Sequence, residues 1–99
     1  MIEVKNLRIE RPKHPWDMRV DRVSVLGNPF RMKEESERDL VCELYKEGFE
    51  KHETNSAYWR ELQHLYKTHQ KFGKLNLFCW CAPKRCHADT IKEFLERFI

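Results

Sequence analysis

The sequence predicts a small single-domain α/β sandwich in which helices pack on a few-stranded sheet, in the order β-β-α-α-β-α. Two observations lead to this class. Strand-like and helix-like apolar patterns alternate late in the chain, and the strand-like segments are too few for a β-sandwich. A chain of 99 residues that is 40% hydrophobic can bury one modest core, so residues 1–99 are expected to form a single domain.

The first part of the chain predicts two strands. Apolar residues alternate imperfectly over residues 2–9, and the cluster of Pro and basic residues at 11–15 ends that pattern. A second short strand is expected over residues 18–25, where Met18, Val20, Val23 and Val25 are apolar. The tetrapeptide Gly27-Asn-Pro-Phe30 then predicts a turn.

Two helices follow. Ser36 is an expected N-cap, and apolar residues recur at helical spacing from Leu40 until the helix ends near residues 48–52. Asn55 or Ser56 is expected to cap the second helix, which Gly73 stops.

The last third predicts a Rossmann-like strand, turn and helix. Residues 74–81 are nearly continuously apolar, which is typical of a central strand covered on both faces. Pro83 breaks the strand, and Ile91, Phe94, Leu95 and Phe98 mark an amphipathic helix.

Three of the four cysteines and one histidine lie around this predicted turn, at Cys79, Cys81, Cys86 and His87. In open α/β sheets, ligands bind beyond the carboxyl ends of the strands, where the next helix offers unpaired N–H groups. Lys84 and Arg85 add two positive charges there, so an anion is the expected ligand. This turn is the predicted functional site.

The cluster has four alternative interpretations. Its cysteines are simply buried core residues, as free cysteines often are. They bind zinc through Cys79, Cys81, Cys86 and His87, although the adjacent Cys86 and His87 rarely point at one metal. They act in catalysis, with Cys86 as a thiolate nucleophile at a helix N-terminus, His87 as acid or base and Cys81 beside them. The fourth, which we favour, is an anion-binding turn without a metal or other cofactor.

In the anion-binding interpretation, Lys84, Arg85 and Arg38 are the expected cations. Asn28 and Trp80, or Phe30, are expected to contact a base or sugar, with Gly27 in the same turn. The Gly-Asn-Pro-Phe turn also has a purely structural explanation, because it redirects the chain from strand to helix. Arg38 lies at a helix start, where the helix dipole disfavours a positive charge. A ligand or carboxylate partner would explain this position, and a solvent-exposed arginine is the default interpretation.

The motifs resemble one known family. The chain resembles the family catalogued as domain of unknown function 4326. The resemblance rests on the Gly27-Asn-Pro-Phe30 turn, on Arg38 and on the pattern Cys-x-Cys-x-Pro-x-x-Cys-His that begins at Cys79. Its members are small proteins often found in phages and bacteria. The resemblance covers most of the chain and implies no biochemical activity.

Composition limits the remaining choices. The 19 basic and 16 acidic residues are interspersed, so the formal charge of +3 does not favour a nucleic acid partner. No apolar run has the length of a signal peptide or membrane span, and a cytoplasmic protein is expected. The sequence therefore predicts binding, or binding and processing, of a nucleotide-like or nucleoside-like anionic small molecule. A phage or bacterial module that captures a host protein and a structural zinc domain are the alternatives.

Overall fold

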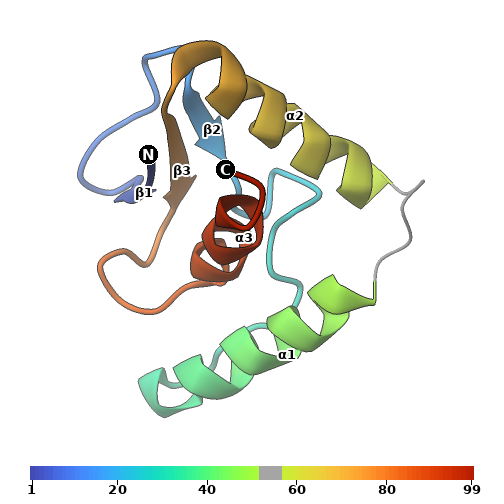
Figure 1. Ribbon diagram of the computed structural model, residues 1–99. Helices are drawn as coiled ribbons and strands as arrows, with labels where there is room; N and C mark the ends of the chain where they lie inside the picture. Colours follow the sequence, from blue (N-terminus) through green and yellow to red (C-terminus); the bar gives the residue numbers. More distant parts are fainter. Residues whose placement is uncertain (52–56) are drawn as a thin grey trace.

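The computed structural model describes residues 1–51 and 57–99 (Figure 1). In this part of the chain, β1 (Ile2–Asn6), β2 (Asp17–Arg19) and β3 (Leu75–Cys79) form a parallel sheet of order β1-β3-β2. The helical elements are a 3₁₀ turn η1 (Glu35–Glu37), α1 (Arg38–Glu50), α2 (Ala57–Phe72) and α3 (His87–Glu96). The predicted α/β class and element order are confirmed, with η1 added before α1.

The central strand β3 organises the fold. It pairs with β1 from Ile2↔Leu75 to Asn6↔Cys79 and with β2 from Asp17↔Asn76 onward. Its side chains at 75, 77, 78 and 79 are almost completely buried, as the continuous apolar run predicts. Because all three strands are parallel, their carboxyl ends meet at one edge of the sheet. This edge carries the residues after Asn6, Arg19 and Cys79.

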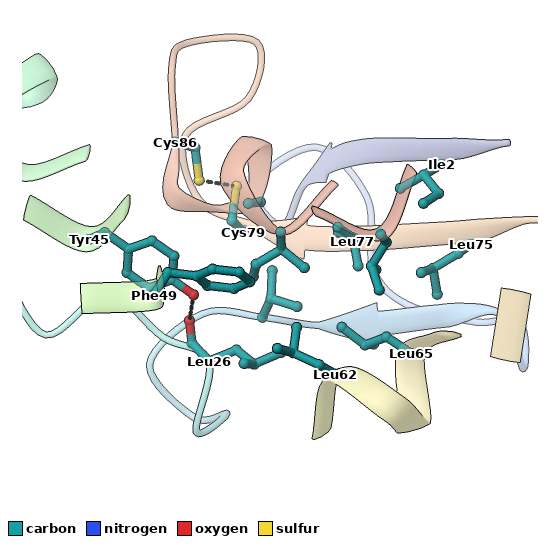
Figure 2. Close-up of a cluster of buried hydrophobic side chains, with 14 of the residues drawn as sticks. Ile2, Leu26, Tyr45, Phe49, Leu62, Leu65, Leu75, Leu77, Cys79 and Cys86 are labelled. Atoms are coloured by element: carbon teal, nitrogen blue, oxygen red, sulfur yellow. Dashed lines mark hydrogen bonds between the residues drawn. The ribbon is translucent and has the colours of Figure 1, made fainter. Parts of the chain in front are cut away.

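The core lies between the sheet and the helices (Figure 2). Helix α2 contacts β3, α3 contacts β1 and β3, and α1 packs against α3. Leu62 and Leu65 from α2 and Leu77 from β3 are buried in this core. The Tyr45 hydroxyl of α1 donates a 2.7 Å hydrogen bond to the carbonyl of Leu26. No helix in the described ranges is both long and apolar enough to cross a bilayer.

Both N-terminal strands are shorter than predicted. β1 ends at Asn6 because the Asn6 Oδ1 accepts the Arg8 N–H at 2.8 Å and bends the chain into a turn. β2 ends at Arg19, although the Val20 N–H still donates to Phe78 O. From Asp21 the chain forms two successive turns, in which Ser24 N–H donates to Asp21 O and Gly27 N–H to Ser24 O.

The predicted strand over residues 18–25 is therefore wrong beyond its first residues. Val23 and Val25 are exposed turn residues and not members of a buried strand face. Their apolar character indicated a strand, but the backbone there is bonded within the turns and not to β3.

The helix starts also differ from the prediction. Glu34, not Ser36, is the N-cap of η1, and the Glu37 carboxylate accepts the N–H groups of Lys33 and Glu34 in a capping box. Ser36 lies inside η1, and α1 begins at Arg38. The predicted caps Asn55 and Ser56 lie outside the described residues.

The C-terminal unit follows the predicted order with tighter bounds. Gly73 ends α2 in a left-handed conformation with φ 73°, as the sequence predicts. β3 ends at Cys79, so Trp80 and Cys81 belong to the following turn, which contains a cis peptide before Pro83. Cys86 is the N-cap of α3, and Phe98 lies just beyond the helix end.

Candidate functional site

A cavity of about 300 Å³ opens at the carboxyl edge of the sheet. It brings together nine residues that the sequence singles out: Asn28, Phe30, Arg38, Cys79, Trp80, Cys81, Arg85, Cys86 and His87. Gly27 and Lys84 lie outside its wall. Asp21, Arg22 and Cys42 also line the cavity, and none of these three was predicted from the sequence.

The cysteines form a cluster of thiols at one side of the cavity. The Cys86 thiol, 3% exposed, donates a 2.9 Å hydrogen bond to Cys79 Sγ (Figure 2). Cys81 lines the same cavity and is only partly buried. Cys42 reaches the same cavity from α1, and burial raises the pKa of its thiol.

The cluster favours a thiolate at Cys81. Hydrogen bonds from Cys79 and Cys86, and then the guanidinium of Arg38, lower the pKa of Cys81 against the opposing effect of burial. Hydrogen bonds with Cys79 and Cys81, together with burial, raise the pKa of Cys86. Cys86, which the sequence suggests as a thiolate nucleophile, is therefore buried and has a raised pKa, and its catalytic role stays a prediction.

His87 contacts Cys86 although the two are adjacent in sequence. Its Nδ1 lies 3.5 Å from Cys86 Sγ, and its Nε2 bonds the carbonyl oxygen of Val20. A carbonyl can only accept, so Nε2 carries the proton and Nδ1 of the neutral ring presents a lone pair to Cys86. Burial lowers the pKa of His87, which keeps the ring neutral.

The cations predicted from the sequence are all paired with carboxylates. Arg38 binds Glu35 through two nitrogens and donates to the carbonyl of Arg85. Lys84 also pairs with Glu35, and together these cations lower the pKa of Glu35 to about 2. The carboxylate partners of Arg85 are Asp39 and Glu43 of α1. These ion pairs attach the loop after β3 to the start of α1.

Arg22 is different. In the described part of the chain, no carboxylate pairs with it, and its guanidinium donates instead to the carbonyls of Asn28 and Phe30. Carbonyl oxygens leave its positive charge uncompensated, and the side chain lines the cavity. Arg22 is therefore the cation best placed to receive an anion.

The N-terminus of α3 already uses part of its hydrogen-bonding capacity. Cys86 N–H donates to the Asp89 carboxylate at 3.1 Å, and the side chain of Cys86 accepts from Asp89 N–H in a capping box. The Cys86 N–H, one of the groups expected to cradle a phosphate, is therefore bonded to the chain itself.

Asn28 is buried, and its side chain holds the turn together. Its amide nitrogen donates to Val41 O at 3.3 Å, and its oxygen accepts the Phe30 N–H at 2.9 Å. These bonds commit both ends of the amide to the protein itself.

The indole of Trp80 is fixed by a buried carboxylate. Its N–H donates to Asp21, whose other partner is Arg19. Burial opposes ionisation, but hydrogen bonds from Arg19 and Trp80 hold the pKa of Asp21 below its usual value. Trp80 is thereby held in place with 48% of its surface exposed.

The zinc site predicted from the sequence gains no support from the described residues. Among the described residues, no group of three or more His, Cys, Asp and Glu side chains is placed so that it could hold a metal ion. The zinc site stays a prediction.

A known protein family matches the chain over nearly its whole length. The family model described as Domain of unknown function (DUF4326) matches residues 4–97. The chain belongs to this family. Neither the comparison with curated proteins nor that with solved structures gave a match.

The DUF4326 match covers every residue of the cavity wall. This cavity combines a thiol cluster with an acidic member, a neutral imidazole, an exposed indole and an arginine without a carboxylate partner among the described residues. In this DUF4326 chain, such a set suits the binding of an anionic molecule with an aromatic or flat part, and nucleophilic chemistry by sulfur.

Proposed function

We propose that the protein binds a nucleotide-like or nucleoside-like anionic small molecule in the cavity at the carboxyl edge of the sheet. The observation that carries this proposal is the position of Arg22, whose guanidinium lines the cavity and contacts only carbonyl oxygens among the described residues. A phosphate placed there gains charge-assisted hydrogen bonds. The location agrees with the general rule for ligand sites in parallel sheets.

Two aromatic rings support the same proposal. Trp80 and Phe30 line the cavity with 48% and 40% of their surfaces exposed. Exposed rings in the wall of a cavity provide flat faces on which a base can stack. The Asp21 carboxylate fixes the indole of Trp80, so little rotamer entropy is lost when a ligand binds.

The ligand roles of the site residues differ from those expected from the sequence. Asn28 and Arg38 are committed to bonds within the protein, so they shape the cavity and do not contact the base or the phosphate in this proposal. Arg22 replaces them as the phosphate contact. Trp80 keeps the role that the sequence assigned to it.

The test is calorimetric titration of the purified protein with AMP, GMP, adenosine, guanosine and inorganic phosphate. We expect a nucleoside monophosphate to bind, and Arg22→Gln to weaken it by roughly 10- to 100-fold, as loss of a charged hydrogen bond of about 1.5–3 kcal/mol implies. Trp80→Leu should weaken both the nucleotide and the nucleoside. The control Arg60→Gln, on the exposed side of α2, should bind like the wild-type protein.

Native mass spectrometry of the untreated protein completes the test. A retained phosphorylated compound would support the proposal and name the ligand class. Absence of binding by all five compounds, with no retained compound, would contradict it and favour the alternative of a module that captures a host protein. Stoichiometric zinc would contradict the free-thiol state and favour the structural zinc domain.

A further inference from the structure

We propose that the exposed face of α2 binds the phosphate backbone of double-stranded DNA, without reading the base sequence. The surface is a basic stripe formed by Arg60, His64, Lys67 and Lys71 of α2 and by Lys74, which follows the helix. None of these residues lines the cavity at the carboxyl edge of the sheet. The inference therefore goes beyond the proposed function and does not depend on it.

Helical spacing brings the basic residues of α2 into one line. Their steps along the sequence are four, three and four residues, and side chains at such steps are neighbours on a helix surface. All members of the basic stripe are exposed, whereas Tyr58, Leu62 and Leu65 on the other side of α2 are buried in the core. From Arg60 to Lys71 the stripe extends over roughly 17 Å, at about 1.5 Å per residue.

The basic stripe carries the excess positive charge of the protein. Residues 57–74 contain four of the 19 basic residues and one of the 16 acidic residues, so this segment alone has the net charge of +3 that the whole chain has. The one acid, Glu61, is only partly exposed. The net charge of the whole chain is too small to favour a nucleic acid partner, but its concentration on one helix face gives a local positive field.

The protein does not neutralise this charge. Among the described residues, no carboxylate forms an ion pair with the Lys and Arg side chains of the basic stripe, whereas the cations around the Cys-His turn are all paired. Lys71 Nζ lies 5.3 Å from the centroid of the Phe72 ring. Lys74 Nζ lies 4.1 Å from the centroid of the Trp16 ring. These cation–π contacts position the two ammonium groups, and their charge stays available because an aromatic ring carries no net charge.

The composition of the basic stripe favours a polyphosphate over other partners. Specific protein interfaces have an apolar core, and helices that lie on membranes insert an apolar face into the lipid. The apolar side chains of α2 are not available for either role, because the core buries them. Lys and Arg side chains without such neighbours contact phosphates and give affinity without sequence specificity.

A duplex of DNA fits the basic stripe better than other nucleic acids. Proteins that bind single strands add aromatic rings on which the bases stack, and no Phe, Tyr or Trp residue belongs to the stripe. Recognition of duplex RNA uses contacts with 2′-hydroxyl groups across the minor groove, which a line of cations on a helix does not provide. Duplex DNA carries one negative charge per about 1.7 Å of its axis, so each cation of the stripe can meet its own phosphate.

The test is fluorescence anisotropy of a labelled DNA duplex of about 20 base pairs, titrated with the full-length protein in roughly 50 to 200 mM salt. We expect a Kd on the order of 10⁻⁴ to 10⁻⁶ M at physiological salt, as is usual for sequence-independent binding. The logarithm of the binding constant should fall with the logarithm of the salt concentration with a slope of about −3 to −4. The stripe has four Lys and Arg side chains, and each phosphate contact contributes about −0.9.

A double substitution on α2 tests the surface. Lys67→Gln combined with Lys71→Gln should reduce the steepness of the slope by about 2 and weaken binding roughly 10- to 100-fold at the lowest salt concentration. The matched control combines Arg31→Gln with Lys33→Gln, which removes the same charge from two exposed residues before η1. The control should keep the slope of the wild-type protein.

Several outcomes would overturn the proposal. One is the absence of duplex binding at the lowest salt concentration. Another is equal weakening by the two double variants, which would mean that the DNA responds to net charge and not to the basic stripe. Tighter binding of the single strand, of an RNA duplex or of anionic lipid vesicles would assign a different partner to α2.

The two proposals fail separately. Arg22→Gln should weaken binding of a nucleoside monophosphate and leave duplex binding unchanged, because Arg22 lines the cavity and does not belong to the basic stripe. Lys67→Gln combined with Lys71→Gln should have the opposite effects. Duplex binding by a protein that binds no nucleotide would support this inference and contradict the proposed function alone.

Discussion

Substitution of Gly27 by alanine should destabilise the protein because no space exists for a side chain there. A Cβ atom at this position would lie 2.5 Å from Arg22 Cα, 2.7 Å from Asp21 O and 2.9 Å from Arg22 N. All three are backbone atoms of the turns that follow β2, and the turns are closed by hydrogen bonds from Ser24 N–H to Asp21 O and from Gly27 N–H to Ser24 O. Relief of the clash therefore requires the turns to open.

The expected loss is about 3 kcal/mol, at the upper end of the range for overpacking, because rigid backbone and no flexible side chain must move. For a chain of this size, that loss corresponds to a decrease in Tm of roughly 12–24 °C. Urea unfolding followed by circular dichroism measures it. Because Arg22 belongs to the displaced turn, Gly27→Ala should also weaken nucleotide binding if the proposed function is correct.

Gly48→Ala is a matched control that should change the stability in the opposite direction. It lies within α1, and a Cβ there meets no atom within 4 Å. Gly48→Ala should stabilise the protein by about 0.5–1 kcal/mol through helix propensity. A loss below about 1 kcal/mol for Gly27→Ala, which is the average for any substitution, would show that the turns accommodate a Cβ without opening.

Three further results are expected. Gly73→Ala should cost about 1–2 kcal/mol in urea unfolding because φ is 73°, although a Cβ there meets no atom within 4 Å. Leu77→Ala, in the fully buried centre of β3, should lower the free energy of unfolding by about 2–5 kcal/mol in the same assay. A smaller loss would mean that the core collapses into the space that the shortened side chain leaves. Burial lowers the pKa of His87, so the imidazole takes up a proton more readily in the unfolded chain than in the folded one. The contribution of His87 to the free energy of unfolding should therefore be complete above the ordinary pKa of 6.5 and should fall as the pH decreases below it. His87→Gln should flatten that slope in part, because His69, whose pKa burial also lowers, contributes with the same sign; an unchanged slope would contradict the buried neutral state of His87.

The central strand and the last helix could be predicted from the sequence because each buries apolar side chains in a pattern that the sequence displays. Leu75, Leu77 and Phe78 have no exposed face, and a short continuous apolar run of this kind is typical of a strand covered on both sides. The second strand was extended too far for a related reason. Val23 and Val25 have the residue type of a strand, but side-chain type does not report where backbone N–H groups bond, and here they bond within turns.

That boundary error also hid two residues of the site. A strand drawn through residue 25 places Asp21 and Arg22 in its middle and not at its carboxyl end. The signal that could have found them is the change from apolar Val20 to a charged pair, which marks the end of a buried strand. Cys42 gave no such signal, since its approach to the cavity depends on how α1 packs against α3.

Charge pairing limits what a sequence can say about an anion site. The sequence places Arg38, Lys84 and Arg85 in the motifs around the Cys-His turn, and net charge alone makes each a candidate. In the folded chain all three are neutralised by carboxylates of η1 and α1, which a linear pattern cannot match to them. Their role becomes positional, because they attach the loop that carries the thiols to α1. Arg22 keeps its uncompensated charge because its turn directs it toward carbonyls, so the cation available at the cavity follows from the fold and not from the basic residues of the motif.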